Sequence, residues 1–205
     1  MNAIILAGGA ARRMNGRRKA FLPLGDETFI QRILRLLAPL FDAVSIVTNE
    51  PDLYAGFPAR AVQDERPGMG PLMGMYSGLK ASGSEMNFVT AVDTPLVSEA
   101  LVRHLVGMGG ECDAWVPQWE GRPEPLCAVY ARRCLPAIES VLGRVTVTGA
   151  AVTARIIAIY PLIRPCPLEE STVRKLDPRG LAFFNVNTQA DYDALRAIHA
   201  ARLTE

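Results

Sequence analysis

Residues 3–19 read AIILAGGAARRMNGRRK: an apolar run, two glycines and then a basic loop. The run from Ala3 to Leu6 is typical of a buried strand. Glycines at positions 8, 9 and 16 permit tight turns and let backbone N–H groups approach a ligand closely. Five basic residues and no acidic residue lie between positions 12 and 19. Because a triphosphate needs both amide donors and cations, the segment predicts a phosphate-binding loop, with a solvated basic loop as the alternative.

Two familiar phosphate-binding motifs are excluded for this segment. It contains no G-x-x-x-x-G-K-[ST] sequence, so the loop is not of the Walker type. It contains no G-x-G-x-x-G sequence that opens a helix, which disfavours a dinucleotide-binding Rossmann site.

The rest of the first half alternates short apolar runs with helical patterns. Further strands are expected at 43–48, 59–63 and 87–92, and helices at 29–41, 71–81 and 98–106. Thr28 is a candidate N-cap for the first helix, and Pro71 stands at the first position of the second. This alternation predicts an α/β fold with a parallel sheet covered by helices. The loops that follow the four strands should share one edge of the sheet, where such folds bind ligands.

The second half is less regular. Strands are expected at 114–118, 126–130, 156–160 and 182–186, and helices at 133–142 and 189–202. The first two of these strands are joined through residues 120–125. No separate domain boundary is visible, so we expect residues 1–205 to form a single domain.

The composition favours an ordinary globular protein. Of 205 residues, 49% are hydrophobic and 21% are charged, as in an average domain. The 22 Lys and Arg residues are balanced by 21 Asp and Glu residues, which excludes a broad basic field for nucleic acid. No apolar run approaches the ~20 residues that span a membrane, and the N-terminus lacks the basic flank of a signal peptide. We therefore expect a cytoplasmic protein with no nucleic-acid or membrane partner.

The cysteines stand at positions 112, 127, 134 and 166. They form no C-x-x-C pair and match no zinc-site spacing. We expect reduced thiols rather than disulfides.

Asp93 is a candidate metal ligand. It ends an otherwise apolar strand, and Pro95 keeps the chain from running straight into a helix. A carboxylate at that strand end, facing a triphosphate, is well placed to hold Mg²⁺, which prefers one or two carboxylates plus phosphates and water. An Asx turn or a helix cap is the alternative role.

Two further segments carry polar side chains at strand ends. Asp64 opens a loop with glycines at 68, 70 and 74, where a nucleobase or ribose can lie against the backbone. An ordinary strand-to-helix loop is the alternative. Asn185 and Asn187 can contribute oxygen to a hard-cation shell, or Asn187 or Thr188 can cap the closing helix.

These residues together resemble the molybdenum cofactor guanylyltransferases, a family of the nucleotidyltransferases that begin with L-A-G-G-x-x-x-R-M-G-x-x-K. The matching segments here are Leu6-Ala7-Gly8-Gly9, Arg13-Met14, Lys19, Asp64, Gly70-Pro71-Leu72-x-Gly74-Met75, Arg122-Pro123-Glu124-Pro125-Leu126, Asp93-Thr94-Pro95 and Asn185-Val186-Asn187-Thr188. Asn15 replaces the motif glycine after Met14, and Arg18 replaces an acidic residue common before the lysine. The resemblance implies a three-layer, Rossmann-like nucleotidyltransferase fold with a mainly parallel central sheet. It also implies a nucleotide-binding half at 1–110 and an acceptor-binding half at 111–205.

The resemblance implies that GMP passes from Mg-GTP to the terminal phosphate of molybdopterin or the molybdenum cofactor, releasing pyrophosphate. Catalysis would then rest on positioning and charge neutralisation. The implied catalytic residues are Arg13, Lys19 and Asp93, with Asp93 as the Mg²⁺ ligand. The implied nucleotide-binding residues are Leu6, Ala7, Gly8, Gly9, Arg13, Lys19, Asn49, Asp64, Gly70, Gly74 and Asp93. The implied acceptor-side residues are Arg122, Asn185 and Asn187.

Three other functions stay open on the sequence. A molybdenum cofactor cytidylyltransferase would share the loop and the metal site and would use CTP. A sugar-phosphate nucleotidyltransferase is a weaker alternative. A non-catalytic nucleotide-binding or cofactor-binding accessory protein belongs to a different class. Other cofactor-biosynthesis proteins and molybdoenzyme chaperones are expected as further partners.

Overall fold

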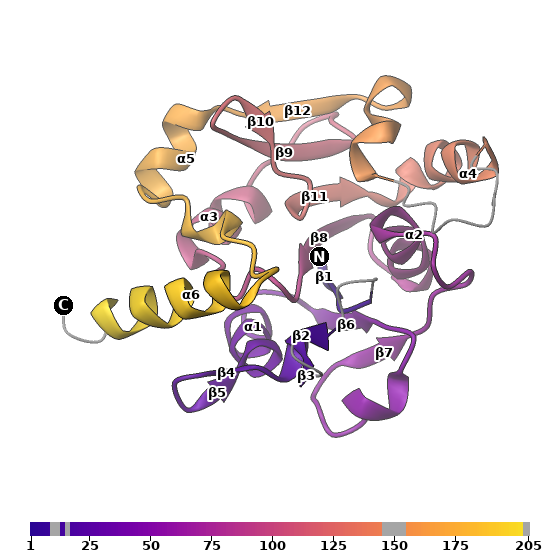
Figure 1. Ribbon diagram of the computed structural model, residues 1–205. Helices are drawn as coiled ribbons and strands as arrows, with labels where there is room; N and C mark the ends of the chain where they lie inside the picture. The colour runs from indigo at the N-terminus through magenta and orange to yellow at the C-terminus, as the bar shows by residue number, and fades with distance from the viewer. Residues whose placement is uncertain (9–12, 15–16, 145–154, 203–205) are drawn as a thin grey trace.

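The computed structural model of the 205-residue chain describes residues 1–8, 13–14, 17–144 and 155–202 (Figure 1). Within them, one sheet of eight strands has the order β10-β9-β11-β8-β1-β6-β7, with β12 paired to β9 beside this path. Its central part consists of β1 (Asn2–Leu6), β6 (Ala43–Val47), β7 (Arg60–Val62) and β8 (Met86–Ala91). These four strands are parallel, which confirms the parallel sheet predicted for the first half.

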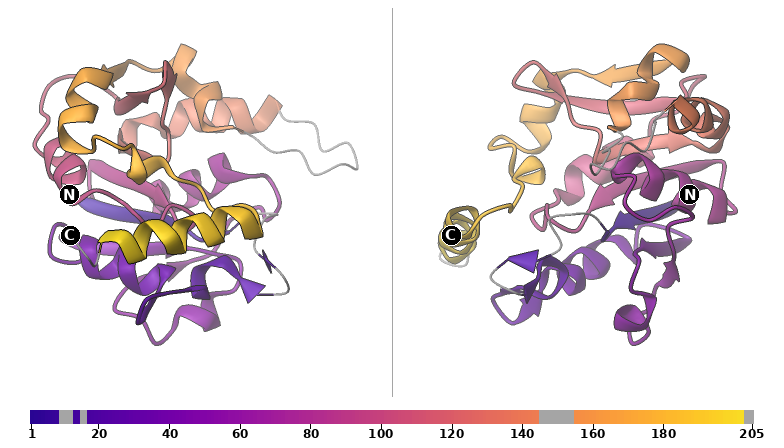
Figure 2. Two further views of the ribbon diagram at one scale, coloured as in Figure 1. Left: turned by 60° about the vertical axis from the view of Figure 1, so that its left-hand side comes forward. Right: turned by 45° about the vertical axis from the view of Figure 1, so that its right-hand side comes forward.

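Side chains of β1 alternate between two hydrophobic clusters, one on each face of the sheet. Ala3 and Ile5 enter the first cluster, and Ile4 and Leu6 enter the second. The first is completed by α1 (Phe29–Leu37), α3 (Glu99–Val106), α5 (Glu170–Leu176) and α6 (Gln189–Arg202). The second is completed by α2 (Pro71–Ala81), α4 (Leu135–Arg144) and the 3₁₀ helix η4 (Ile156–Leu162). Helices therefore cover both faces, and the three-layer prediction is confirmed (Figure 1, Figure 2).

The helices of the first half begin where the sequence predicts. Thr28 caps α1, because its Oγ1 accepts from Gln31 N at 3.4 Å while Gln31 Oε1 accepts from Thr28 N at 2.8 Å. Pro71 stands in the first turn of α2. Helix α1 ends at Leu37 rather than at the expected position 41. None of the helices in the described residues has both the length and the apolar character that crossing a membrane requires.

The second half adds antiparallel pairs to the sheet. The expected strands are present as β9 (Ala114–Trp119) and β11 (Cys127–Ala131), with the short β10 (Arg122–Pro123) between them. Strand β11 pairs antiparallel with both β9 and β8. The sheet is thus continuous from β7 to the edge of the second half.

The prediction of strands at 156–160 and 182–186 is wrong. Residues 156–160 lie in η4, where Ile156 and Ile159 reach the core at a spacing of three residues. Residues 182–186 begin in the 3₁₀ turn η5 (Leu181–Phe183) and continue without strand pairing. The strand that does form is β12 (Pro165–Leu168), parallel to β9. The sequence does not predict this strand because it contains two prolines. Proline cannot donate a hydrogen bond to a neighbouring strand and is tolerated mainly at sheet edges.

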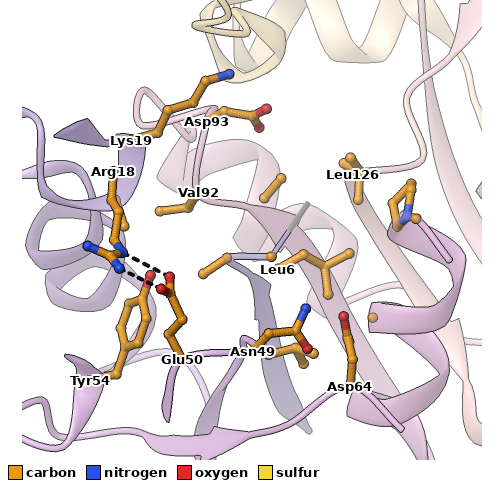
Figure 3. A pocket seen from close by; sticks show the side chains of 18 of the residues that line it. Leu6, Arg18, Lys19, Asn49, Glu50, Tyr54, Asp64, Val92, Asp93 and Leu126 are labelled. Carbon is orange, nitrogen blue, oxygen red and sulfur yellow. Dashed lines mark hydrogen bonds and ion pairs between the residues drawn. The ribbon is translucent and has the colours of Figure 1, made fainter. Parts of the chain in front are cut away.

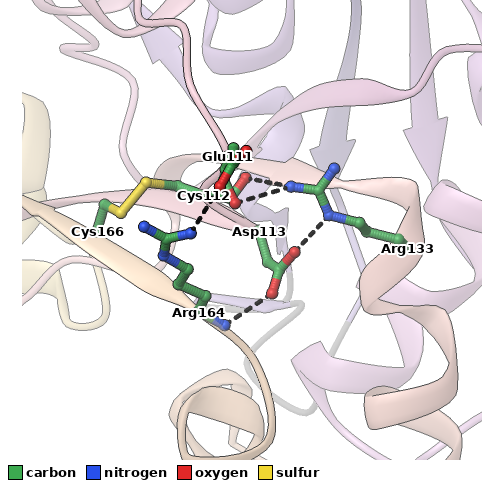
Figure 4. Close-up of a disulfide and its surroundings, with 6 residues drawn as sticks. All are labelled: Glu111, Cys112, Asp113, Arg133, Arg164 and Cys166. Atoms are coloured by element: carbon green, nitrogen blue, oxygen red, sulfur yellow. Dashed lines mark hydrogen bonds and ion pairs between the residues drawn. A yellow bond between two sulfur atoms is a disulfide. The ribbon is translucent and has the colours of Figure 1, made fainter.

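The prediction of reduced cysteines is wrong for two of the four. Cys112 and Cys166 form a disulfide, with their Cα atoms 5.9 Å apart (Figure 4). The pairing of β12 with β9 sets Cys166 opposite Trp115, which brings it within disulfide reach of Cys112 just before β9. Spacing along the chain could not reveal this contact. Cys127 and Cys134 are free and buried.

Two short ribbons lie outside the main sheet. In one, β2 (Arg13–Met14) pairs with β3 (Arg17–Arg18), and in the other, β4 (Pro23–Leu24) pairs with β5 (Glu27–Thr28). The first ribbon leads into the 3₁₀ turn η1 (Lys19–Phe21). This turn brings Lys19 to the edge of the sheet where the parallel strands end.

Candidate nucleotide-binding site

A cavity of about 480 Å³ opens at the carboxyl ends of the parallel strands (Figure 3). Its wall includes the residues that follow β1, β6, β7 and β8, namely Ala7, Gly8, Asn49, Glu50, Asp64, Val92 and Asp93. Backbone hydrogen bonds hold these strand ends in register, as from Thr48 N to Val62 O at 2.9 Å. The prediction that the four loops share one edge is therefore confirmed.

Asp93 and Lys19 occupy one end of this cavity (Figure 3). Oδ1 of Asp93 is buried and has no hydrogen-bond partner among the described residues. Burial raises the pKa of Asp93, and the charge of Lys19 opposes this shift. The Lys19 side chain is also buried, and burial lowers its pKa against the opposing charges of Asp93 and Asp191. A desolvated carboxylate beside a desolvated ammonium, both facing a cavity, is typical of a functional site.

The C-terminal segment contacts both residues at this end of the cavity. Lys19 Nζ donates to Asn187 Oδ1 at 2.7 Å. Val186 N donates to the backbone oxygen of Asp93 at 2.9 Å. Thr188 and Asp191 cap the N-terminus of α6. Thr188 Oγ1 accepts from Asp191 N at 3.2 Å, and Asp191 Oδ2 accepts from the backbone N–H of Thr188 at 2.7 Å. The side chain of Asn187 is therefore directed to the lysine rather than to the cap.

Asp64 and Asn49 lie away from Lys19 and Asp93 (Figure 3). Asp64 is enclosed by two glycines: a Cβ at Gly8 would lie 3.6 Å from its Oδ2, and a Cβ at Gly74 would lie 3.5 Å from its Oδ1. Oδ1 of Asn49 is buried without a hydrogen-bond partner in the described part of the chain. A carboxylate and an amide on glycine-rich backbone can bind the hydroxyl and N–H groups of a nucleoside.

The loop before α2 forms another part of the wall. Gly68 and Gly70 line the cavity and have backbone φ angles of +91° and +84°, which residues other than glycine adopt only with strain. Pro71 then begins α2, so that the positive end of the helix dipole lies at the cavity. Leu126 brings the second half of the chain to the same cavity.

Sequence reasoning missed the polar group formed by Arg18, Glu50 and Tyr54. Arg18 donates from Nε to Glu50 Oε2 at 2.8 Å and from Nη2 to Glu50 Oε1 at 2.5 Å. Burial and the charge of Glu50 raise the pKa of Tyr54 to about 12. The sequence held one signal, since Glu50 follows the strand at 43–47 much as Asp93 follows the strand at 86–91. Its pairing with a residue 32 positions earlier could not be read from the chain.

The predicted nucleotide-binding residues meet in this cavity as far as they are described. The cavity is lined by Leu6, Ala7, Gly8, Lys19, Asn49, Asp64, Gly70, Gly74 and Asp93. Gly9 and the side chain of Arg13 lie outside what the structure describes. Arg122 and Asn185 are exposed and do not line the cavity, and Asn185 Nδ2 donates to Phe183 O at 3.3 Å.

Comparison with known proteins agrees with this geometry. The model of the MobA-like NTP transferase domain matches residues 3–157. A molybdenum cofactor guanylyltransferase of Desulfosudis oleivorans is 36% identical, with 100% of this chain and 98% of that protein covered. A probable molybdenum cofactor guanylyltransferase of Pelotomaculum thermopropionicum is 35% identical over 92% of this chain and 88% of that protein. The crystal structure of molybdopterin-guanine dinucleotide biosynthesis protein A from Archaeoglobus fulgidus superimposes with a TM-score of 0.79 at 26% identity, covering 98% and 100% of the two chains.

Proposed function

The chain belongs to the MobA-like NTP transferase family and is a nucleotidyltransferase, and we propose on this premise that it transfers GMP from Mg-GTP to molybdopterin or the molybdenum cofactor. The full-length similarity to molybdenum cofactor guanylyltransferases supports GTP as donor and a molybdopterin phosphate as acceptor. The single observation that carries the proposal is one cavity at the carboxyl ends of the strands, lined by Asp93 and Lys19 at one end and by Asp64 and Asn49 away from them.

In the proposed reaction, an oxygen of the acceptor's terminal phosphate forms a bond to the α-phosphorus of GTP. The bond from that phosphorus to the bridging oxygen breaks, and the electron pair leaves with pyrophosphate. The attacking phosphate is already ionised, so the chain needs no strong general base. Its residues therefore act by positioning the reactants and by offsetting charge.

Lys19 and Arg13 are the residues proposed to offset the negative charge of the triphosphate. The position of Lys19 supports its role, because its ammonium lies at the same end of the cavity as Asp93. Leu6, Ala7, Gly8 and Gly9 are proposed to carry the nucleotide on their backbone, and Gly70 and Gly74 to leave it room. Asp64 and Asn49 are proposed to bind the nucleoside.

Asp93 is the proposed ligand of Mg²⁺. No group of three or more His, Cys, Asp or Glu side chains in the described residues can hold a metal ion. One buried carboxylate with a free oxygen fits Mg²⁺ in a nucleotidyltransferase, since this ion is commonly held by one or two carboxylates together with substrate phosphates and water. When bound, Mg²⁺ would neutralise charge on the phosphates.

The acceptor is proposed to enter from the second half. The described contacts that support this division between residues 1–110 and 111–205 are those of Leu126 and Asn187, which reach the cavity and Lys19 respectively. Arg122, Asn185 and Asn187 are the proposed acceptor-side residues. We assign the reaction to the cytoplasm, with other cofactor-biosynthesis proteins and molybdoenzyme chaperones as later partners.

The test is a transfer assay on the full chain with Mg²⁺, molybdopterin and each of GTP, CTP, ATP and UTP. We expect pyrophosphate and a guanine dinucleotide product in equal amounts from GTP alone. Product from CTP alone would replace the proposal with a cytidylyltransferase. No product from any nucleotide, with nucleotide binding intact, would leave an accessory protein.

A further inference from the structure

Arg18 and Glu50 form an ion pair on the wall of the nucleotide cavity (Figure 3). We infer that they are a positioning pair for transfer: they fix residues 18–21 against residues 50–57 so that Lys19 keeps its ammonium at the triphosphate end. This inference rests on the proposed function and adds two residues to it. Arg18 stands at a variable position of the opening motif, directly before Lys19, and Glu50 lies outside the matching segments.

The ion pair has the geometry of a strong, directional contact. Arg18 uses Nε and Nη2 to donate to the two carboxylate oxygens of Glu50, at 2.8 and 2.5 Å. The side chains are 32% and 33% exposed, so both are partly withdrawn from solvent. A two-pronged arginine–carboxylate contact fixes orientation as well as distance. A lysine at position 18 could not make it.

An aromatic contact joins the same two segments. Phe21, at the end of η1, lies 5.4 Å from Tyr54 and 6.3 Å from Phe57, measured between ring centroids. Tyr54 lies in the 3₁₀ helix η2 (Pro51–Tyr54), which begins immediately after Glu50. Residues 18–21 are therefore held against residues 50–57 at both ends, by an ion pair at Arg18 and by ring packing at Phe21.

Lys19 stands between these two contacts and points the other way. Lys19 is 4% exposed, and its Nζ donates to Asn187 Oδ1 at 2.7 Å. The preceding ribbon gives little support, because β2 and β3 contain only two residues each. The backbone at position 19 is held by its own turn, in which Leu22 N donates to Lys19 O at 3.0 Å, and by the contacts of its neighbours. Loss of the Arg18–Glu50 pair would remove the contact that holds the chain on the N-terminal side of the lysine.

Arg18 could instead contact phosphate directly, and the two roles differ in what Glu50 does. In a positioning pair, removal of either partner has the same effect, and removal of both has no further effect. For a direct phosphate ligand, loss of Arg18 would cost much more than loss of Glu50. The structure favours the first role, because two nitrogens of Arg18 already bind Glu50.

The experiment measures GTP-dependent pyrophosphate release by R18M, E50Q, the double variant R18M/E50Q and the exchanged pair R18E/E50R, in the full chain. We expect KM for GTP to rise about tenfold in each single variant and in the double variant, with recovery in the exchanged pair. The matched control is the pair of Arg35, on α1, and Glu27, on β5, joined at 2.6 and 3.1 Å; their side chains are 63% and 29% exposed, and neither residue lines the cavity. The variants R35M and E27Q should change KM by less than twofold, and all variants should unfold at similar temperatures.

The decisive measurement repeats R18M and E50Q in a Lys19→Ala background. Because the pair acts through Lys19, we expect neither substitution to raise KM further there. A tenfold rise that persists without Lys19, or a loss in R18M much larger than in E50Q, would overturn the inference. If the native chain transfers GMP and the pair variants match the control, the inference fails alone; if the native chain transfers none, it fails together with the proposed function.

Discussion

The two halves of the sheet use their strand ends differently. In the first half, β1, β6, β7 and β8 are parallel, and their carboxyl ends deliver polar side chains to one cavity. In the second half, antiparallel pairing of β9, β10 and β11 sends neighbouring strand ends in opposite directions. There the charged side chains gather beside the disulfide, at the start of β9 (Figure 4). At the cavity, Asp93 and Asn49 keep buried oxygens without a hydrogen-bond partner in the described residues, whereas the charged side chains beside the disulfide are paired with one another.

Asp93 and Asp113 show this difference with one residue type. Asp93 has a buried oxygen without a hydrogen-bond partner in the described residues, and burial raises its pKa. Asp113 accepts from the Arg133 side chain and from Arg164 N, and its contact with Arg133 holds its pKa low. The first carboxylate costs stability and is available to a ligand, whereas the second contributes stability and is already occupied.

The largest expected effect comes from Asp93→Asn. We expect transfer to fall at least about a thousandfold, or about 4 kcal/mol of transition-state stabilisation. The free energy of unfolding should stay equal or rise, because a buried charge is removed. The matched control, Asp113→Asn, should keep turnover within twofold and lower stability by about 1–2 kcal/mol. Turnover assays and denaturant unfolding of both variants check this contrast, and normal turnover in Asp93→Asn would break it.

The next effect concerns the Cys112–Cys166 disulfide. Opening this crosslink between positions 54 residues apart should lower stability by about 2–4 kcal/mol. Cys166→Ser should therefore unfold at a lower temperature and should no longer respond to a reductant. Cys134→Ser serves as the control, because Cys134 is a free buried thiol, and it should keep the reductant response. Unchanged stability of the native chain under reductant would show that the second half does not depend on the crosslink.

A smaller effect is expected from Lys19→Met. Loss of one cation from the proposed triphosphate site should lower kcat/KM for GTP by about ten- to a hundredfold, or about 1.4–2.8 kcal/mol. Lys80→Met is the control, because Lys80 lies on α2 and its Nζ pairs with Glu65 at 2.6 Å, away from the cavity. The measurement is kcat/KM for GTP in both variants by steady-state kinetics, and it tests whether the cations at the cavity differ in function from those elsewhere. Equal values for the two would remove Lys19 from the site.

The smallest effect is a pH dependence of stability at Glu124, in the connection between β10 and β11. Burial, with a smaller contribution from Glu120, raises the pKa of Glu124 from its ordinary value of 4.5 to about 7. Between pH 4.5 and about 7, Glu124 keeps its proton in the folded chain but loses it in the unfolded chain. The free energy of unfolding therefore falls as the pH rises through this range, and the stabilisation by the protonated carboxyl is lost above about pH 7. Partial exposure screens the group and limits the loss to about 1 kcal/mol. Unfolding of Glu124→Gln at pH 5 and pH 8 should lack this decline; an identical decline in both proteins would contradict it.

The first half could be predicted well because its signals are local. The apolar run before Gly8, the cap at Thr28 and the proline that opens α2 each act on neighbouring residues, and each is confirmed. The shared edge followed from parallel topology alone, and it brought Asp64 and Asp93 to one cavity.

The second half could not be predicted as well because its structure depends on distant contacts. Strand β12 forms against proline propensity by pairing with β9, and that pairing also creates the disulfide. Residues 182–186 are apolar enough for a strand, but Val186 binds the backbone of Asp93 instead. The Arg18–Glu50 pair joins two loops of opposite charge, and nothing in either loop specifies its partner.

The central claim is that the edge of the parallel strands binds a metal–triphosphate complex through Asp93. Isothermal titration of GTP into the native chain and into Asp93→Asn, each with and without Mg²⁺, tests it most directly. We predict that Mg²⁺ raises the affinity for GTP at least about tenfold in the native chain, or about 1.4 kcal/mol, and that this gain disappears in Asp93→Asn. An equal gain in both proteins would contradict the account.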